Sequence, residues 1–190
     1  MQYTGSPSSI MGPSMTTVAQ MVNYFNSTGR TYPSAVYTQY GAPDITTWCQ
    51  ILLQEANLEG VRAEVVFCQA MKETGWLQFG GSVSVGQCNF GGLGAVDGST
   101  AGADFSSYGS DAVRIGLRAQ IQQLKGYATT TPEAQFANPI VSPRFYLLAQ
   151  LGYRGIAPTL EGLNGRWAVP GTTYGQDILK MINTLFTFSK

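Results

Sequence analysis

The chain has 190 residues, enough for one domain that buries a hydrophobic core without help from disulfides or metals. Only 12% of the residues are charged, and eleven acids balance eleven bases, so no broad electrostatic field attracts nucleic acid or an anionic membrane. The sequence has no histidine, which excludes Ser-His-Asp and Cys-His nucleophilic catalysis and histidine-ligated zinc.

Cysteine usage and the chain's apolar runs exclude further classes. Cys49, Cys68 and Cys88 form no CxxC pair, and the first two lie in apolar helical patterns where a thiol acts as a small hydrophobe. A Cys49–Cys68 disulfide stays open, because neighbouring helices can bring the two together. No apolar run approaches the roughly 20 residues of a membrane span, and the start shows no signal peptide. We expect no metal, no cofactor, no nucleic acid and no membrane span.

The first elements in chain order are an arm and two helices. Residues 1–13 are rich in Ser, Gly and Pro, which predicts a flexible arm or linker. Ser14 is the candidate N-cap of a helix with apolar residues at helical spacing. Asp44 is the candidate N-cap of a second helix over residues 45–58, which Gly60 ends.

The following helix has a different character. From Val61 to about Thr74 it is apolar almost all round, which predicts a place in the centre of the fold. Gly75 is its expected C-terminal stop. Residues 75–109 are then rich in Gly, Ser and Val in short alternating runs, which predicts hairpins or a glycine-rich lobe over a groove.

Helices dominate the remainder. One resumes at Ser110, and Ser142-Pro143 opens a short one. Residues 152–173 are expected to form a loop, and the pattern from Tyr174 to Leu185 predicts a final amphipathic helix. The layout indicates an α+β fold that is predominantly helical.

Glu73 is the candidate chemical group, since it stands alone in the acid-free segment "AMKETGWLQFGG", residues 70–81. Its expected place at the end of an apolar helix, beside Trp76 and Phe79, would raise its pKa through desolvation and the helix dipole. A carboxyl that keeps its proton near neutral pH suits general acid catalysis of glycoside cleavage, which proceeds without histidine. The alternative is a solvated last-turn glutamate that pairs with Lys72.

Four segments, in order over residues 58–185, resemble glycoside hydrolase family 73, the bacterial endo-β-N-acetylglucosaminidases of the lysozyme superfamily. The segments are "AEVVFCQAMKETGW", "QCNFGGLGA", "ADFSSYGSDAV" and "RWAVPGTTYGQDI". The resemblance implies one domain over residues 14–190 with a lysozyme-like fold, a small β or glycine-rich lobe flanking the groove, and extra N-terminal helices over residues 14–57.

The resemblance also implies a substrate and a place of action. The expected partner is the glycan strand of bacterial peptidoglycan, cleaved at the β-1,4 bond after N-acetylglucosamine. Such a chain would work outside the cell or in the cell wall, and wall-binding domains on a longer parent would fit its neutral charge. No cofactor is implied.

Site roles are carried over residue by residue. Glu73 takes the general acid position, and Tyr174 matches a tyrosine that lines the cleft, or is the first core residue of the last helix. Asn89 and Phe90 match the floor of the sugar site, with core anchoring the alternative for Phe90. Two further aromatic residues, Trp76 and Tyr108, are candidates for stacking on sugar rings, with core packing a rival for Trp76.

The second carboxylate is the least fixed part of the pattern. Asp97 is the preferred candidate, although Asp-Gly is also a favoured hairpin tip, and Asp104 is the other. The substrate's own N-acetyl group is a further alternative nucleophile. The chain departs from the family where Val169-Pro170 replaces the usual Asp-Pro and where Cys88 stands in place of Asn.

Two rival functions stay open on the sequence. A muramidase or lytic transglycosylase also uses a lone glutamate at a helix end. A non-catalytic glycan-binding module derived from the same fold would keep the groove without turnover.

Overall fold

A computed structural model describes residues 6–96 and 100–190. The α-helices in these ranges are α1 (Val18–Ser27), α2 (Ser34–Tyr37), α3 (Ile45–Glu59), α4 (Ala63–Thr74), α5 (Ala112–Ala128), α6 (Phe145–Gln150) and α7 (Tyr174–Leu185). The two strands are β1 (Ala95–Val96) and β2 (Thr100–Ala101), and short 3-10 helices lie in the connections.

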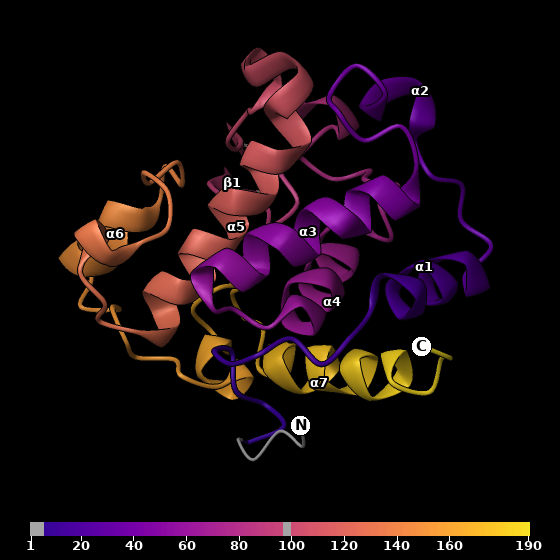
Figure 1. The fold of residues 1–190 in the computed structure, drawn as a ribbon. Helices are drawn as coiled ribbons and strands as arrows, with labels where there is room; N and C mark the ends of the chain where they lie inside the picture. Colours follow the sequence, from indigo (N-terminus) through magenta and orange to yellow (C-terminus); the bar gives the residue numbers. More distant parts are fainter. Residues whose placement is uncertain (1–5, 97–99) are drawn as a thin grey trace.

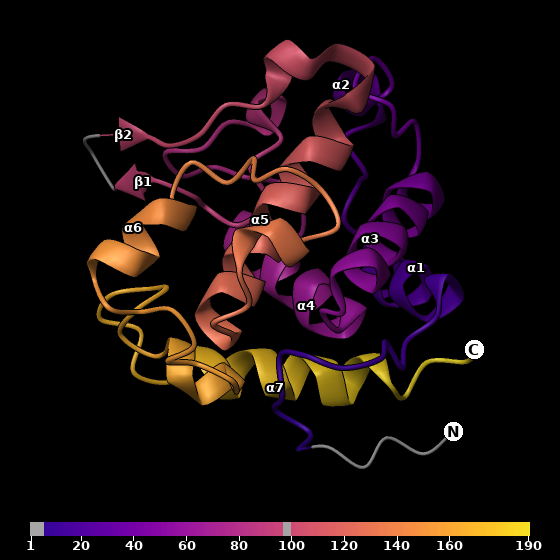
Figure 2. The ribbon, with the colours of Figure 1, turned by 60° about the vertical axis from the view of Figure 1, so that its left-hand side comes forward.

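Helix α4 is the central element, as its apolar sequence predicts. Ten of its twelve residues are buried, and the exceptions are Lys72 and Glu73 in its last turn. Helix α3 packs on one side of it and α7 on another, so that α7 runs beneath α4 (Figures 1 and 2). Gly75 ends the helix with φ 56°, the left-handed conformation that glycine adopts without a steric penalty.

Helix α5 lies against α3 and carries the segment that forms the floor of the groove. Gly116 of α5 allows this contact, because a Cβ there would meet the carbonyl oxygen of Cys88 at 1.8 Å. Buried ion pairs also join the two helices. Glu55 binds Arg114 and Arg118, each at 2.8 Å, and Glu59 binds Lys125 at 2.7 Å. The sequence reading did not identify these pairs.

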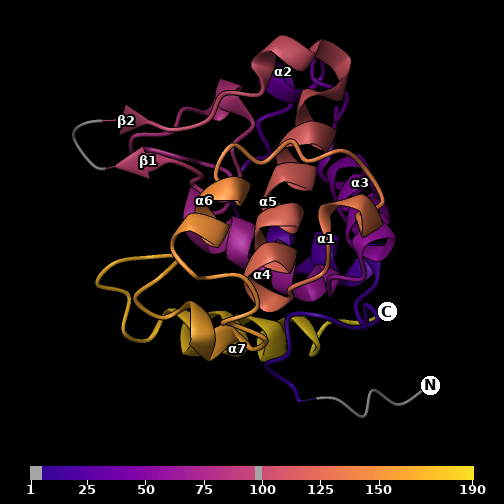
Figure 3. The same cartoon turned by 90° about the vertical axis from the view of Figure 1, so that its left-hand side faces the viewer.

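Strand structure is limited to one short antiparallel ribbon. Ala95 pairs with Ala101 and Val96 with Thr100, and the ribbon projects from one edge of the helical body (Figures 2 and 3). The other described residues of the glycine-rich segment that we expected to form hairpins lie in turns, loops and 3-10 helices. The chain is therefore mostly helical with few strands, which is consistent with a helical lysozyme-like domain.

The N-terminal region differs from the expectation in two ways. Thr17, not Ser14, caps α1, because its hydroxyl accepts from the backbone N–H of Gln20 and the Gln20 side chain accepts from Thr17 in return. Residues 6–13, predicted as part of a flexible arm, lie against the body. Ile10 is fully buried there, and its backbone N–H donates to Pro158.

The cysteines are buried, as the apolar pattern predicted for Cys49 and Cys68. Cys49, Cys68 and Cys88 are free and buried, so the Cys49–Cys68 disulfide considered above is not formed. Within the described residues, no helix combines the length and the hydropathy needed to cross a bilayer.

Candidate active site

Glu73 projects from the last turn of α4 toward the first residue of α7. The Tyr174 hydroxyl donates a short hydrogen bond to Oε1 of Glu73. Tyr174 is itself buried, so its ring packs in the core while its hydroxyl reaches the acid. Lys72, which the sequence offered as an ion-pair partner of Glu73, forms an ion pair with Asp177 at 3.2 Å instead.

Two buried glutamines hold the tyrosine in this orientation. Gln69, one helical turn before Glu73, donates from Nε2 to the Tyr174 hydroxyl at 3.0 Å. Gln120 of α5 donates to Oε1 of Gln69 at 2.9 Å and to the Val66 carbonyl at 3.2 Å. Since Gln69 occupies a lone pair of the hydroxyl, the tyrosine proton points to Glu73.

The surroundings of Glu73 favour the protonated form. Burial raises the pKa of the Glu73 carboxyl, while the hydrogen bond from Tyr174 and the charge of Lys72 lower it in part. The net direction is upward, as the sequence led us to expect. Burial also raises the pKa of Tyr174 well above its ordinary value, so the tyrosine remains a donor near neutral pH.

The turn after Glu73 has an unusual backbone. Trp76, Leu77 and Phe79 all have φ values near +60°, a region that non-glycine residues rarely adopt. Thr74 supports the turn, because its hydroxyl accepts from the Leu77 N–H at 2.8 Å and its carbonyl accepts from the Phe79 N–H at 2.7 Å. Strained backbone of this kind clusters at functional sites, and here it directs Phe79 into the groove wall.

A groove of about 680 Å³ opens beside the carboxyl of Glu73. Its lining comes from the end of α4, the turn that follows, the glycine-rich segment, the residue that precedes α6 and the loop before α7. The lining residues are Glu73, Thr74, Gly75, Phe79, Gly81, Ser82, Val83, Asn89, Gly91, Gly92, Ala95, Arg144, Arg166, Trp167, Ala168 and Val169. Gly92 approaches the acid so closely that a Cβ would lie 3.1 Å from Oε2 of Glu73.

A second hollow of about 320 Å³ continues on the other side of the acid. Lys72, Tyr174 and Asp177 help to line it, and Glu73 and Ala168 line both hollows. The carboxyl therefore stands where the two meet, with space on both sides for a chain-like ligand.

Two predicted aromatic contacts lie in the core and not in the groove. Trp76 packs edge-on against Tyr24 and Phe67, with ring centroids 4.8 and 6.3 Å away. Phe90 is fully buried against Trp48, so the anchoring alternative describes its position. Neither side chain lines the groove beside Glu73.

Asn89 and the other candidates lie at varied positions. Asn89 lines the groove, but its buried side-chain amide mainly stabilises the loop that forms the groove floor. Its Oδ1 accepts from the Leu93 N–H at 2.8 Å. Tyr108 is 49% exposed and outside the groove lining. Asp104 is exposed and caps a turn by accepting from the Ser106 N–H at 2.8 Å, which lowers its pKa. Asp97 lies outside the described residues.

Sequence reasoning missed several groove residues. Trp167 is the indole at the groove, held by a hydrogen bond from Nε1 to the Gly91 carbonyl at 3.1 Å. Its occurrence as Arg-Trp inside the last family-like segment could have marked it. Gln69 could have been found as an amide on an apolar helix face, four residues before Glu73. Arg144 carries no local signal.

A partly buried carboxylic acid at a helix end, midway along an open groove, is the arrangement of a glycoside hydrolase that uses a general acid. The chain belongs to the glucosaminidase family, glycoside hydrolase family 73, whose description is mannosyl-glycoprotein endo-β-N-acetylglucosaminidase and whose match covers residues 49–186. Membership in this family points to a glycoside hydrolase.

The chain is also similar to an uncharacterized protein of Borreliella burgdorferi. The two are 34% identical over 145 residues, which is 76% of this chain and 65% of that protein. The chain thus spans slightly less than two thirds of the relative's length. No solved structure matches the chain at a significant level.

Proposed function

We propose that the chain hydrolyses the β-1,4 bond between N-acetylglucosamine and N-acetylmuramic acid in peptidoglycan, with Glu73 as the general acid. The observation that carries the proposal is the place of Glu73, a partly buried carboxyl of raised pKa where two hollows of the groove meet. A general acid must hold its proton until the glycosidic oxygen accepts it, and burial serves that need. The groove, open on both sides of the acid, suits cleavage within a strand.

In this proposal the helical body has a lysozyme-like fold, and the 76–109 segment flanks the groove. Tyr174 keeps the acid in place by its hydrogen bond and stabilises the carboxylate once the proton has left. Trp167 offers an indole face to a sugar ring.

The partner of the acid lies on the flanking segment or on the substrate. Within the described residues, Glu73 is the carboxylate that lines the larger hollow. Asp177 lines the smaller hollow but is paired with Lys72, and Asp104 lines neither hollow. We therefore assign the second role to Asp97 or to the substrate's N-acetyl group, which can attack the anomeric carbon from within the sugar. Asp97→Asn separates the two: loss of turnover by about 100-fold assigns the role to Asp97, and retained turnover favours the N-acetyl group.

Mass spectrometry of digested cell wall, after borohydride reduction, tests the bond. The proposal predicts new reducing ends on N-acetylglucosamine. Reducing or anhydro N-acetylmuramic acid would make the chain a muramidase or lytic transglycosylase. Binding to the wall with no released fragments would make it a glycan-binding module.

A further inference from the structure

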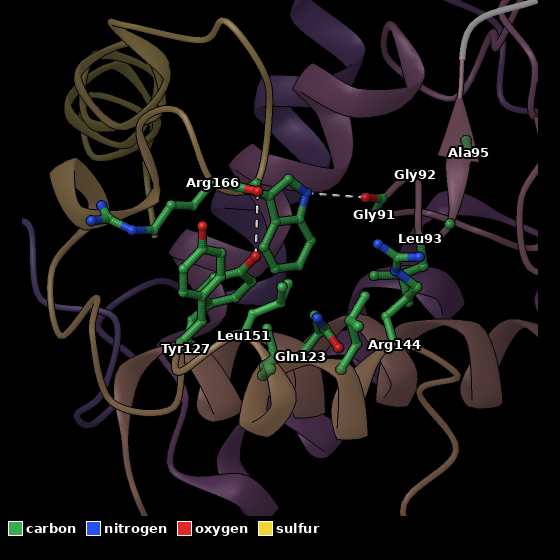
Figure 4. A pocket seen from close by; sticks show the side chains of 14 residues that line it. Gly91, Gly92, Leu93, Ala95, Gln123, Tyr127, Arg144, Leu151 and Arg166 are labelled. Atoms are coloured by element: carbon green, nitrogen blue, oxygen red, sulfur yellow. Dashed lines mark hydrogen bonds between the residues drawn. The ribbon is translucent and has the colours of Figure 1, made fainter.

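A side pocket of about 170 Å³ adjoins the groove, and Figure 4 shows the side chains that line it. Gly91, Arg144, Arg166 and Trp167 line both the pocket and the groove, so the two are continuous. The far wall comes from α5, α6 and the loop that follows α6. A substituent on a glycan lying in the groove would reach it past Trp167.

The floor of this pocket holds a buried donor. Gln123 is only 5% exposed, and its Oε1 accepts from the Ser142 hydroxyl at 2.7 Å. This contact fixes the amide, so that Nε2 lies in the space between Tyr127 and Arg144 (Figure 4). Among the described residues, no acceptor is found for Nε2. The Nε2 amide therefore faces the pocket as a donor that a carboxylate oxygen of a ligand can accept from.

Two arginines line this pocket, and Figure 4 shows the Arg144 guanidinium beside Gln123 and the Arg166 guanidinium turned away beyond Tyr127. Arg144 is exposed at its rim, and Arg166 is held on the opposite side by donating from Nη1 to the Gly162 carbonyl at 3.0 Å. Neither forms an ion pair with a carboxylate in the described part of the chain. No acid lines the pocket there, so donors and positive charge face one small space.

The charge reaches into the pocket. Burial raises the pKa of Tyr127, whose hydroxyl sits between the arginines, and the charges of Arg144 and Arg166 oppose that rise. Both guanidinium fields therefore act on the same space, where they favour an anion.

We propose that this side pocket binds a carboxylate carried on the glycan strand, paired with Arg144 and accepting from Nε2 of Gln123. In peptidoglycan such a group is an acid of the peptide stem or, where the stem has been removed, the lactyl carboxylate of N-acetylmuramic acid to which it was amide-linked. The inference rests on the proposed function and adds a determinant of substrate choice to it. Planar donors of this kind match carboxylate geometry.

The pocket is tested by measuring how glycan strands bind to the Glu73→Gln variant, which should bind them without cleaving them. Two kinds of soluble glycan strand are used, one with peptide stems and one from which an amidase has removed the stems. Each is compared with a form in which its carboxylates have been converted to methylamides. In Glu73→Gln we expect the methylamides to bind about tenfold more weakly, the reach of one charge-assisted hydrogen bond. An effect confined to strands with stems assigns the carboxylate to the stem, one confined to stem-free strands assigns it to the lactyl group, which is free only there, and an effect in both shows that the pocket accepts either carboxylate.

The matching variant is Glu73→Gln with Arg144→Gln, in which the difference between native and methylamide strands should vanish. Arg144 is exposed, so the fold is expected to tolerate the change. Glu73→Gln with Arg30→Gln, which alters an exposed arginine outside the groove, should keep the difference. Equal binding of native and methylamide strands by Glu73→Gln, or no binding of either, overturns the inference.

Turnover by the unaltered chain separates the two proposals. Cleavage of native and methylamide strands at the same rate, together with equal binding, leaves the proposed function standing and removes the pocket. Cleavage of neither form removes the proposed function itself.

Discussion

The Glu73 carboxyl meets opposing influences from its neighbours. Burial favours the protonated form, whereas the Tyr174 hydroxyl and the Lys72 charge favour the anion. The first effect prevails, so the acid keeps its proton to a higher pH than a free glutamate. In the proposed reaction the weaker effects matter after proton transfer, when they stabilise the carboxylate.

Tyr174→Phe separates these effects by the sign of a pH shift. Because the lost hydrogen bond lowers the pKa of Glu73, the variant should raise that pKa and move the alkaline limb of kcat to higher pH. We expect kcat at the optimum to fall about tenfold, since one charged hydrogen bond is lost. Tyr146→Phe is the control, because Tyr146 donates to Glu133 at 2.7 Å on the exposed surface. A limb that stays or moves to lower pH contradicts the account.

Stability should also depend on the protonation of Glu73. A folded-state pKa above the unfolded one gives stability that is present below the unfolded pKa and lost as pH rises through the folded pKa. Glu73→Gln, which stays neutral, should therefore gain in unfolding free energy relative to the parent chain as pH rises through this window. Urea unfolding across pH measures the difference; a constant difference would mean that burial does not raise the pKa.

Gly92→Ala tests the close approach to the acid. A methyl group would lie 3.1 Å from Oε2 of Glu73, where the glycosidic oxygen must come, so turnover should fall at least tenfold. Gly29→Ala is the matched control, since Gly29 has a similar φ of 69° but nothing within 4 Å of its Cβ position. Both changes should cost about 1 kcal/mol of stability through the left-handed backbone. Equal activity in the two variants would show that the space beside Gly92 is not used.

At the scale of elements, buried ion pairs join the helices around the site. Burial acts to raise the pKa of Glu55, but hydrogen bonds from Arg118 and Arg114 outweigh it, and the pKa is lowered. These contacts hold α5 on α3 and thereby keep Gln120 in reach of Gln69.

Glu55→Gln should lower the unfolding free energy at pH 7 by about 2 kcal/mol, the scale of hydrogen bonds to a charged group. With a lowered folded pKa, the contribution is present above the unfolded value of about 4.3 and is lost as pH falls through the folded pKa. The gap between the chains in urea unfolding should therefore close in acid. Asp111→Asn, at an exposed acid, should leave stability near that of the parent chain. A gap that persists in acid would contradict the ion-pair explanation.

Local signals predicted the helices but not their partners. The apolar run before Gly75 gave the end of α4, and Asp44 gave the start of α3, because caps and glycine stops act within one turn. The prediction that Ser14 caps α1 was wrong, because Thr17 forms a reciprocal capping box with Gln20. The strands were overestimated because glycine-rich alternation also suits turns.

At the scale of the whole molecule, the site exists only in the folded chain. Glu73 and Tyr174 are 101 positions apart and meet because α7 packs on α4. The sequence identified both residues, one by its isolation and one by the family-like segment. Trp167 and Arg144 could not be assigned in the same way, since their roles follow from loop paths that bring α6 and the segment before α7 to one groove.

Turnover of purified cell wall by Glu73→Gln tests whether Glu73 is the general acid. The substitution keeps the size of the side chain and removes the transferable proton, so the release of fragments should fall by about 100-fold or more. Circular dichroism should show the same helical content as in the parent chain. A folded variant that releases fragments at nearly the parent rate would contradict the role given to Glu73.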